Sequence, residues 1–211
     1  FPPLKDCPQP PLTDTQKRIL ELKKERDAVI LAHNYVCPEI QDVADYVGDS
    51  LGLSRQAKKA GAKVIAFAGV DFMAETAKIL NPDKTVVIPD RAAGCSLEEL
   101  CEPLELAAFK KKHPGALVIS YINCGAGVKE LSDIICTSGN ALDIVRQIPA
   151  DREIIFCPDQ NLGSWIIEQT GRDMILWNGY CRAHVQYNAE ELLEAKKAFG
   201  GAPLVCHPEC P

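Results

Sequence analysis

Short hydrophobic runs alternate with longer amphipathic stretches along the chain. The runs are rich in β-branched residues, which is typical of buried strands, and the stretches between them carry apolar residues at helical spacing. Several of these stretches begin near Ser, Thr or Asn and end near Gly, as helices do. The alternation predicts an α/β fold with parallel sheets. The expected strands are residues 28–33, 63–69, 85–89, 116–121, 133–136, 153–158, 174–177 and 203–207.

The pattern repeats at a period near 87 residues. The three strand ends at His33, Tyr121 and His207 lie 88 and 86 residues apart. Other residues keep the same separations: Tyr35, Asn123 and Glu209; Asp45 and Asp133; Ser50 and Ser138; and Cys95 and Cys181. This period exceeds that of solenoid repeats, so it favours a small α/β domain that is used more than once.

We therefore expect repeated three-layer αβα domains with small four-stranded parallel sheets. Residues 14–96 and 97–182 form two copies, residues 183–211 form the first helix and strand of an incomplete third copy, and residues 1–13 form an extended lead-in. A single helix and strand cannot bury their own apolar faces, so we expect the chain to stop before the third domain is complete. If the copies surround a pseudo-threefold axis with the carboxyl ends of their strands inward, the matched residues converge on one cavity.

Composition narrows the function classes. With 46% hydrophobic residues among 211, the chain can bury a sizeable core. Its formal net charge of −6 argues against a nucleic-acid partner, because no basic stripe is present to neutralise phosphates. No apolar run approaches the roughly 18 residues that span a bilayer. Many of the ten cysteines sit inside apolar runs, which indicates buried thiols in a reducing compartment.

The matched pair Cys95 and Cys181 is a candidate metal site. The repeat predicts a third cysteine near position 267, beyond these 211 residues. Three symmetry-related thiolates suit an iron–sulfur cluster, and a four-iron cubane held by three cysteines keeps one iron open as a Lewis acid. Spacing alone equally allows two ordinary thiols. Cys101, six residues after Cys95, is interpreted as structural.

Polar residues at the matched positions are candidates for substrate binding. Ser50 and Ser138 each precede a helical stretch, where a serine N-cap and free backbone N–H groups can bind phosphate. Simple helix capping is the alternative for both serines. Tyr121 and Asn123 can orient a polar substrate by hydrogen bonding.

Titratable groups at the strand ends are candidates for proton transfer. His33 and Tyr35 follow the first strand, and His207 and Glu209 form the matching pair in the third copy. A hydrogen-bonded core histidine is the alternative for His33. Glutamate is costly to bury unpaired, so Glu209 at a strand end indicates a base or a ligand contact.

Several stretches together resemble the quinolinate synthase family, the iron–sulfur enzymes of de novo NAD biosynthesis. The matching stretches are ILAHNYVCPEIQDVADYVGDSLGLSRQA, FAGVDFMAETAKILNPDKTVVIPDRAAGCSL, DIICTSGNA, CPDQNLG, ILWNGYCRAH and HPEC. They cover the chain from about residue 14 to its end. The resemblance implies three homologous α/β domains around a pseudo-threefold axis and a [4Fe-4S] cluster held by one cysteine from each domain.

The resemblance also implies a reaction. Members of the family condense iminoaspartate with dihydroxyacetone phosphate, releasing phosphate and water to give quinolinate. The implied location is the cytoplasm, or a plastid in a plant, with functional coupling to L-aspartate oxidase. No nucleic-acid or membrane partner is implied.

Site residues carry over by position. Cys95 and Cys181 match the first two cluster ligands, and the third lies outside this chain. Ser50 and Ser138 match residues that hold the substrate phosphate. The implied catalytic residues are Glu209, His33 and Tyr35, and the implied substrate-binding residues also include Tyr121, Asn123, His184 and His207.

Two alternatives use the same residues differently. A zinc-dependent lyase or hydrolase would bind its metal through the same thiolates and use metal-bound water as the nucleophile. A phosphometabolite-binding module would use the serines and leave the cysteines inert. The binding module predicts unchanged ligand affinity when Cys95 and Cys181 become Ser. Visible absorption by an iron–sulfur cluster after anaerobic purification distinguishes the expected enzyme from the zinc enzyme.

Overall fold

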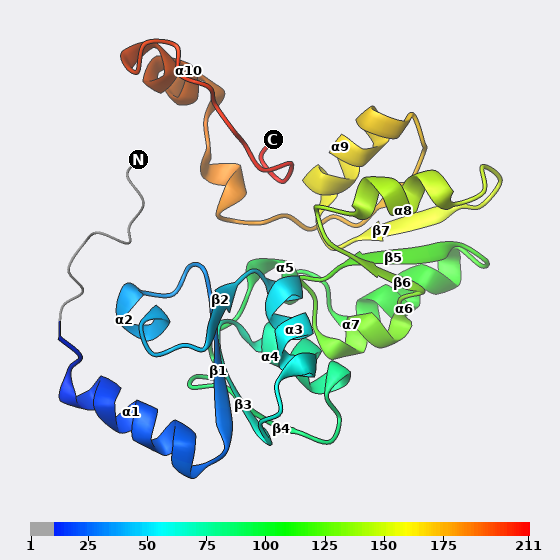
Figure 1. Ribbon diagram of the computed structural model, residues 1–211. Coiled ribbons are helices and arrows are strands. Elements are labelled where there is room, and N and C mark those ends of the chain that lie inside the picture. The colour runs from blue at the N-terminus through cyan, green and yellow to red at the C-terminus, as the bar shows by residue number, and fades with distance from the viewer. Residues whose placement is uncertain (1–10) are drawn as a thin grey trace. The chain divides into compact units, whose positions relative to one another are not determined.

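The computed structural model describes residues 11–211, so the expected lead-in falls largely outside the described residues. These residues form two compact units, one of residues 11–69 and 77–90 and the other of residues 70–76 and 91–211. Each unit holds one four-stranded parallel sheet, which confirms the expected α/β class (Figure 1). The repeat boundaries at residues 96/97 and 182/183, and the pseudo-threefold axis, stay predictions.

The first unit has the strand order β2-β1-β3-β4, and every neighbouring pair is parallel. Its strands are β1 (Ala28–His33), β2 (Tyr46–Gly48), β3 (Val64–Ala68) and β4 (Thr85–Val87). Its helices are α1 (Asp14–Glu25), α2 (Pro38–Gln41) and α3 (Ser50–Lys59), and α4 (Asp71–Leu80) is divided between the two units. The strand β2 is not among the expected strands, because it is short, lies at the sheet edge and is largely exposed.

The second unit repeats this topology with the order β6-β5-β7-β8, again with parallel neighbours. Its strands are β5 (Leu117–Tyr121), β6 (Ile134–Cys136), β7 (Ile154–Cys157) and β8 (Ile175–Leu176). Its helices are α5 (Ser96–Glu99), α6 (Pro103–Lys112), α7 (Ala126–Leu131), α8 (Ala141–Gln147), α9 (Gln160–Thr170), the 3₁₀-helix η2 (His184–Gln186) and α10 (Ala189–Ala198). Throughout the described residues, every helix is too short or too polar to cross a membrane.

One aspartate contact is the same in both sheets. In the first unit the Asp45 carboxylate accepts a hydrogen bond from Ile30 N–H at 2.8 Å. In the second unit the Asp133 carboxylate accepts one from Val118 N–H at 2.8 Å. Each aspartate precedes an edge strand and bonds to the neighbouring strand, so it helps to fix the register of that pair. These two matched positions of the sequence repeat are therefore structural.

Both faces of the second sheet are covered by helices, with α8 and α9 on one face and α6 and α7 on the other (Figure 1). Alternate residues of a strand point to opposite faces. Ile154 and Phe156 of β7 pack in a core that includes residues of α8 and α9. Ile155 and Cys157 pack in a core that includes residues of α6 and α7. The expected αβα layers are therefore confirmed in this unit.

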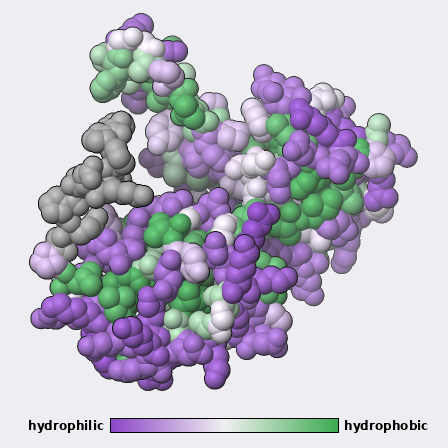
Figure 2. Space-filling view, in the orientation of Figure 1, coloured by the Kyte–Doolittle hydropathy of each residue, from purple (hydrophilic) through white to green (hydrophobic). Residues whose placement is uncertain are grey.

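The segment expected to begin a third copy contains a helix but no strand. Residues 203–207 are irregular, so the expectation of a strand there is wrong for the described chain. A strand is stable only beside others, and within residues 11–211 no strand pairs with this run. The helix α10 has no buried residue, and Figure 2 shows hydrophobic residues on its surface.

Candidate active site

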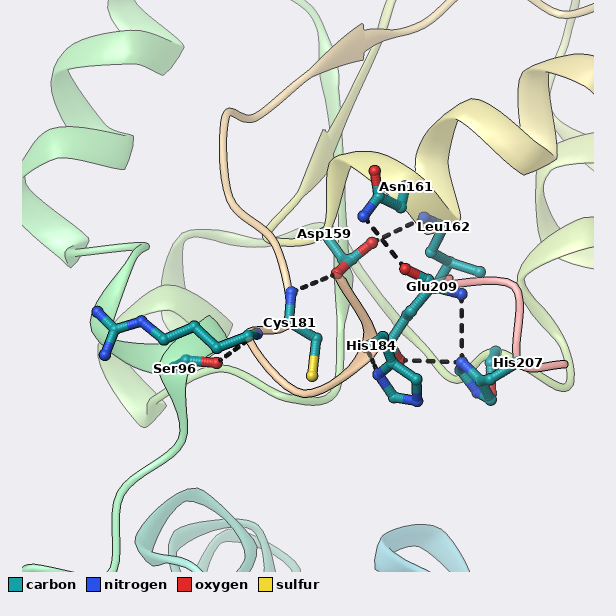
Figure 3. Close-up of polar contacts among 10 residues, drawn as sticks. Ser96, Asp159, Asn161, Leu162, Cys181, His184, His207 and Glu209 are labelled. Carbon is teal, nitrogen blue, oxygen red and sulfur yellow. Dashed lines mark hydrogen bonds and ion pairs between the residues drawn. The ribbon is translucent and has the colours of Figure 1, made fainter. Parts of the chain in front are cut away.

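Glu209 lies at the centre of a group of polar side chains in the second unit (Figure 3). Its side chain is almost fully buried, with 2% of its surface exposed. One carboxylate oxygen, Oε2, lies 3.1 Å from Nδ1 of His184. The other, Oε1, lies 3.4 Å from Nδ1 of His207. A buried carboxylate between two imidazoles can exchange a proton with either ring.

The two imidazoles stack on each other, and one of them contacts a serine. Their ring centroids are 4.8 Å apart and their planes differ by 26°. His207 Nε2 lies 3.1 Å from Ser138 Oγ, and the two atoms share a hydrogen bond. Burial lowers the pKa of His207, and the neighbouring His184 lowers it further. The neutral form of His207 is therefore favoured.

Tyr121 reaches the same group from the end of β5. Its side chain is buried, and Glu209 and Ser138 lie close enough to its hydroxyl to affect its pKa. Burial raises the pKa of Tyr121 well above its usual value, and the negative charge of Glu209 raises it further. The phenol therefore stays protonated near neutral pH and can donate a hydrogen bond.

Asp159, which the sequence analysis missed, positions the residue that carries one of the candidate thiols. It lies fully buried just after β7. Its carboxylate accepts hydrogen bonds from Leu162 N–H at 2.7 Å and from Cys181 N–H at 3.1 Å (Figure 3). Burial raises the pKa of Asp159 to about 6, although both N–H groups favour the carboxylate. The repeat could have indicated this residue, because Asp71 stands 88 positions before it.

Asn161, also missed, lies near the start of α9. Its Nδ2 donates to the backbone carbonyl of Glu209 at 3.1 Å and so ties the segment around Glu209 to the helix. The position 88 residues earlier is Met73, so the repeat carries no signal for this asparagine.

The candidate thiols Cys95 and Cys181 are half-buried against the same hydrophobic core of the second unit. The residues that follow them are joined directly, because Arg182 N–H donates to Ser96 Oγ at 3.2 Å. Burial raises the pKa of both thiols. The negative charge of Cys181 raises the pKa of Cys95 further, as expected for neighbouring thiolates.

The surroundings of these two thiols fit a cationic metal centre. Backbone N–H groups of the second and third residues after each cysteine favour its thiolate. Burial nevertheless keeps both pKa values above the usual thiol value, so a bound cation is needed to stabilise two thiolates at neutral pH. The donor set therefore suits two of the three cysteine ligands of an iron–sulfur cluster.

A second group of ligand atoms also includes Cys181. Cys181, His184 and Glu209 offer a sulfur, a nitrogen and an oxygen atom that all lie within 4.8 Å of one another. Thiolate, imidazole and carboxylate are common ligands of transition metal ions. This corner of the second unit is therefore a candidate metal site.

His33 and Tyr35 lie together in the first unit, at the end of β1 and just beyond it. Their ring centroids are 4.0 Å apart, and Tyr35 is 56% exposed. Burial lowers the pKa of His33, and the negative charge of Asp49 opposes this shift. Convergence of these two residues with those of the second unit stays a prediction.

Neither Ser50 nor Ser138 occupies a helix N-cap position, so the serine N-cap is wrong both as simple capping and as the expected basis of a phosphate site. Asp49 caps α3 through Oδ1, which accepts a hydrogen bond from a backbone N–H at 2.6 Å, and Ser50 is the first helical residue. Asn140 occupies the N-cap position of α8, two residues after Ser138, but its side chain makes no capping hydrogen bond. Asn140 Oδ1 instead accepts a hydrogen bond from Thr137 N–H at 2.7 Å. Neither serine hydroxyl therefore caps a helix.

The structure brings most of the expected site residues of the second unit together. His184 and His207 contact the Glu209 carboxylate, and Ser138 hydrogen-bonds to His207. Cys181 offers its sulfur within 4.8 Å of the Glu209 and His184 ligand atoms, and the charge of Glu209 affects the pKa of Tyr121. Asn123 is half-buried just after β5, and we find no hydrogen bond from its side chain within residues 11–211.

Comparison with known proteins gives one consistent family. A family model described as Quinolinate synthetase A protein matches residues 17–211. The quinolinate synthase of Thermosynechococcus vestitus is 58% identical over 205 residues, which cover 97% of this chain and 64% of that protein. The quinolinate synthase of Synechocystis sp. is 57% identical over 209 residues, which cover 99% of this chain. The chain spans about 64% of the length of both curated relatives, and it belongs to the quinolinate synthetase A family.

Proposed function

We propose that the protein is a quinolinate synthase, which condenses iminoaspartate with dihydroxyacetone phosphate to quinolinate with loss of phosphate and water. Membership of the family supports this reaction. The observation that carries the proposal is the buried Glu209 carboxylate, which contacts two imidazoles and lies beside the Cys181 thiol. A group that can transfer protons and a group that can bind metal therefore lie side by side within the second unit.

The cofactor of this proposal is a [4Fe-4S] cluster held by Cys95, Cys181 and a third cysteine outside these 211 residues. Two half-buried thiols on one core, with N–H groups that favour their thiolates, support the first two ligands. When bound, such a cluster supplies an iron with an open position that acts as a Lewis acid toward substrate oxygens.

Glu209 is the general base of the proposed reaction. Its carboxylate takes a proton from the substrate and returns it during loss of water. Burial of Glu209 keeps bulk water from competing for the proton. His33 and Tyr35 supply the remaining proton transfers.

Hydroxyl, amide and imidazole groups bind the substrates. Ser50 and Ser138 donate to the triose phosphate and fix that end of the intermediate. The hydrogen bond between Ser138 Oγ and His207 Nε2 supports this role, because it orients the hydroxyl. The other substrate contacts are made by Tyr121, Asn123, His184 and His207.

Iminoaspartate is a reactive substrate, because an imine hydrolyses in water. Functional coupling to L-aspartate oxidase, which would form iminoaspartate close to where it is used, follows from this reactivity. We place the reaction in the cytoplasm, or in a plastid if the source is a plant.

The proposal is tested with a chimera in which these 211 residues replace the matching part of the Thermosynechococcus vestitus relative. After anaerobic purification, it is expected to hold about four irons per chain and to form quinolinate from the two substrates. Cys95→Ser and Cys181→Ser are expected to lose both the visible cluster absorption and the activity. Cys37→Ser, which alters an exposed cysteine, is the matched control.

Glu209→Gln separates the base from the cluster. It is expected to retain the cluster absorption and to lower kcat by a factor of about 10² to 10⁴, the usual contribution of a general base. A chimera that remains free of iron after reconstitution contradicts the cluster. An iron-loaded chimera that forms no quinolinate contradicts the reaction.

A further inference from the structure

The loop between β5 and α7 carries Asn123, whose side chain makes no hydrogen bond within the described residues. This β5–α7 loop comprises residues 122–125. Ile122 N–H donates to the Cys136 carbonyl at 2.8 Å, and Cys124 N–H donates to the Ile122 carbonyl at 2.8 Å. The backbone is therefore bonded on both sides of Asn123, while its side chain can bind a ligand.

Glu75 of α4 holds the end of this loop. Its Oε2 accepts a hydrogen bond at 2.7 Å from the N–H of Ala126, the first residue of α7. The N-cap residue Gly125 has no side chain to make this bond, and N–H groups in the first turn of a helix have no partner within the helix. A carboxylate from another helix thus replaces a local cap and interacts favourably with the helix dipole.

Lys129 of α7 holds the middle of the loop. Its Nζ donates a hydrogen bond to the Cys124 carbonyl and lies 5.4 Å from the centroid of the Phe72 ring. Burial lowers the pKa of Lys129, and nearby negative charges, including those of Glu75 and Glu98, oppose this shift. The carboxylates therefore offset part of the cost of burying the ammonium group.

The first unit has the Lys129 contact at the matched position. Gln41 and Val36 stand 88 residues before Lys129 and Cys124. Gln41 Nε2 donates to the Val36 carbonyl at 2.7 Å. In each unit, the bonded carbonyl belongs to the residue that directly follows a candidate site residue. The repeat thus keeps this contact with two different donor side chains.

We propose that Glu75 and Lys129 are positioning residues, which hold the β5–α7 loop so that Asn123 presents its amide to the substrate. This inference rests on the proposed function, because it takes Asn123 as a substrate contact. Glu75 and Lys129 act through the loop backbone and do not touch the substrate themselves. Misplacing a group at a reaction site by about 1 Å can lower the rate by about 10²-fold, so the position of the loop matters.

The kinetic test is a double-mutant cycle in the iron-loaded chimera with the Thermosynechococcus vestitus relative. Asn123→Ala identifies the substrate whose KM depends on this side chain. Glu75→Ala and Lys129→Met are each expected to raise that KM about tenfold, as the loss of one hydrogen bond does. In the Asn123→Ala background they should change it less than about twofold, because they act through Asn123.

Two further variants separate positioning from a general loss of structure. Glu75→Gln keeps an acceptor oxygen for the Ala126 N–H, so its KM should stay within about twofold of the parent value. Glu130→Ala is the matched control, because Glu130 is an exposed carboxylate on the same helix as Lys129. It should leave both KM values unchanged.

Amide hydrogen exchange of the cluster-free chimera tests the loop without the reaction. The amides of residues 122–126 are expected to exchange at least about tenfold faster in Glu75→Ala and Lys129→Met than in the parent or in Glu130→Ala. Circular dichroism of each variant establishes that it is folded. If Glu75→Ala does not fold, Lys129→Met completes the cycle.

Three results overturn the proposal. They are parent-like KM values and exchange in both Glu75→Ala and Lys129→Met, an equally large effect of these changes in the Asn123→Ala background, and a Glu75→Gln protein as impaired as Glu75→Ala. A chimera that forms no quinolinate contradicts the proposed function instead. The exchange rates then decide whether the two residues hold the loop, and unchanged rates overturn the inference.

Discussion

Burial alters the proton affinity of single carboxylates in the second unit. The pKa of Glu98 is raised from 4.5 to about 7 by burial, and the negative charges of Glu75 and Asp71 act in the same direction, while Lys129 opposes them. Because folding raises this pKa, the folded state binds the proton more tightly than the unfolded chain. Glu98 therefore contributes stability below about pH 4.5 that is lost as the pH rises to about 7.

We expect Glu98→Gln to flatten this pH dependence. The urea midpoint of the parent should fall more between about pH 5 and pH 7.5 than that of the variant, since glutamine does not titrate. Glu99→Gln is the control, because Glu99 is the exposed neighbour on the same short helix. If the urea midpoint changes equally with pH in all three proteins, Glu98 does not cause the pH dependence of stability.

Asp159→Asn tests the other buried carboxylate. Asparagine keeps one acceptor oxygen and places an NH₂ group against a second backbone N–H, so one of the two hydrogen bonds is lost in a buried place. We expect the free energy of unfolding to fall by about 1–3 kcal/mol at pH 7.

Asp49→Asn is the matched control for this substitution. Asp49 also caps a helix, but it is exposed, and asparagine caps as well as aspartate. Urea unfolding should therefore show almost no change. If Asp159→Asn and Asp49→Asn lower the free energy of unfolding equally, the burial of Asp159 does not increase the cost of losing its hydrogen bond.

At the scale of elements, the turn after β8 depends on one glycine. A Cβ atom at Gly179 would lie 2.4 Å from the carbonyl oxygen of Pro158, which is closer than real side chains approach. The Gly179 carbonyl also accepts a hydrogen bond from Gln160 N–H at 2.8 Å. The backbone of this turn is thus held against the start of α9, two residues before Cys181.

Gly179→Ala should displace this turn. We expect a loss of about 1–3 kcal/mol in the free energy of unfolding, the usual cost of overpacking. Gly61→Ala is the control, because an added Cβ there meets no atom within 4 Å. A Gly179→Ala protein that unfolds at the same urea concentration as Gly61→Ala would show that the turn can move freely.

The two errors in the strand predictions have opposite physical causes. The strand Tyr46–Gly48 was missed because an exposed edge strand needs no apolar run. Residues 203–207 were wrongly expected as a strand because an apolar run becomes one only beside a neighbour. The other seven runs each contain a strand, because buried parallel strands carry continuous β-branched sequence.

At the scale of the whole molecule, α10 contributes no core. Leu193 on this helix is 54% exposed, whereas Leu106 on α6 is fully buried. We expect Leu106→Ala to cost about 2–5 kcal/mol and Leu193→Ala less than about 0.5 kcal/mol. Urea unfolding of the two variants measures the difference. Similar losses for both would mean that α10 packs against the rest of the chain.

The long repeat was the most informative feature of the sequence. It predicted two sheets of one topology, and both are present. It also aligned Cys95 with Cys181 and could have aligned Asp71 with Asp159. It could not predict Asn161 or the Asp49 cap, because these contacts belong to one copy or to a single turn.

The hydrogen bond between Arg182 N–H and Ser96 Oγ has an entropic consequence. It joins two loops that are 86 residues apart in the sequence, each beginning at a candidate thiol. Bringing together two loops so far apart in the sequence costs conformational entropy, and this cost is met when the second unit folds. A metal centre that bridges Cys95 and Cys181 would therefore find the two thiols already close together. Its binding would not carry that entropy cost a second time.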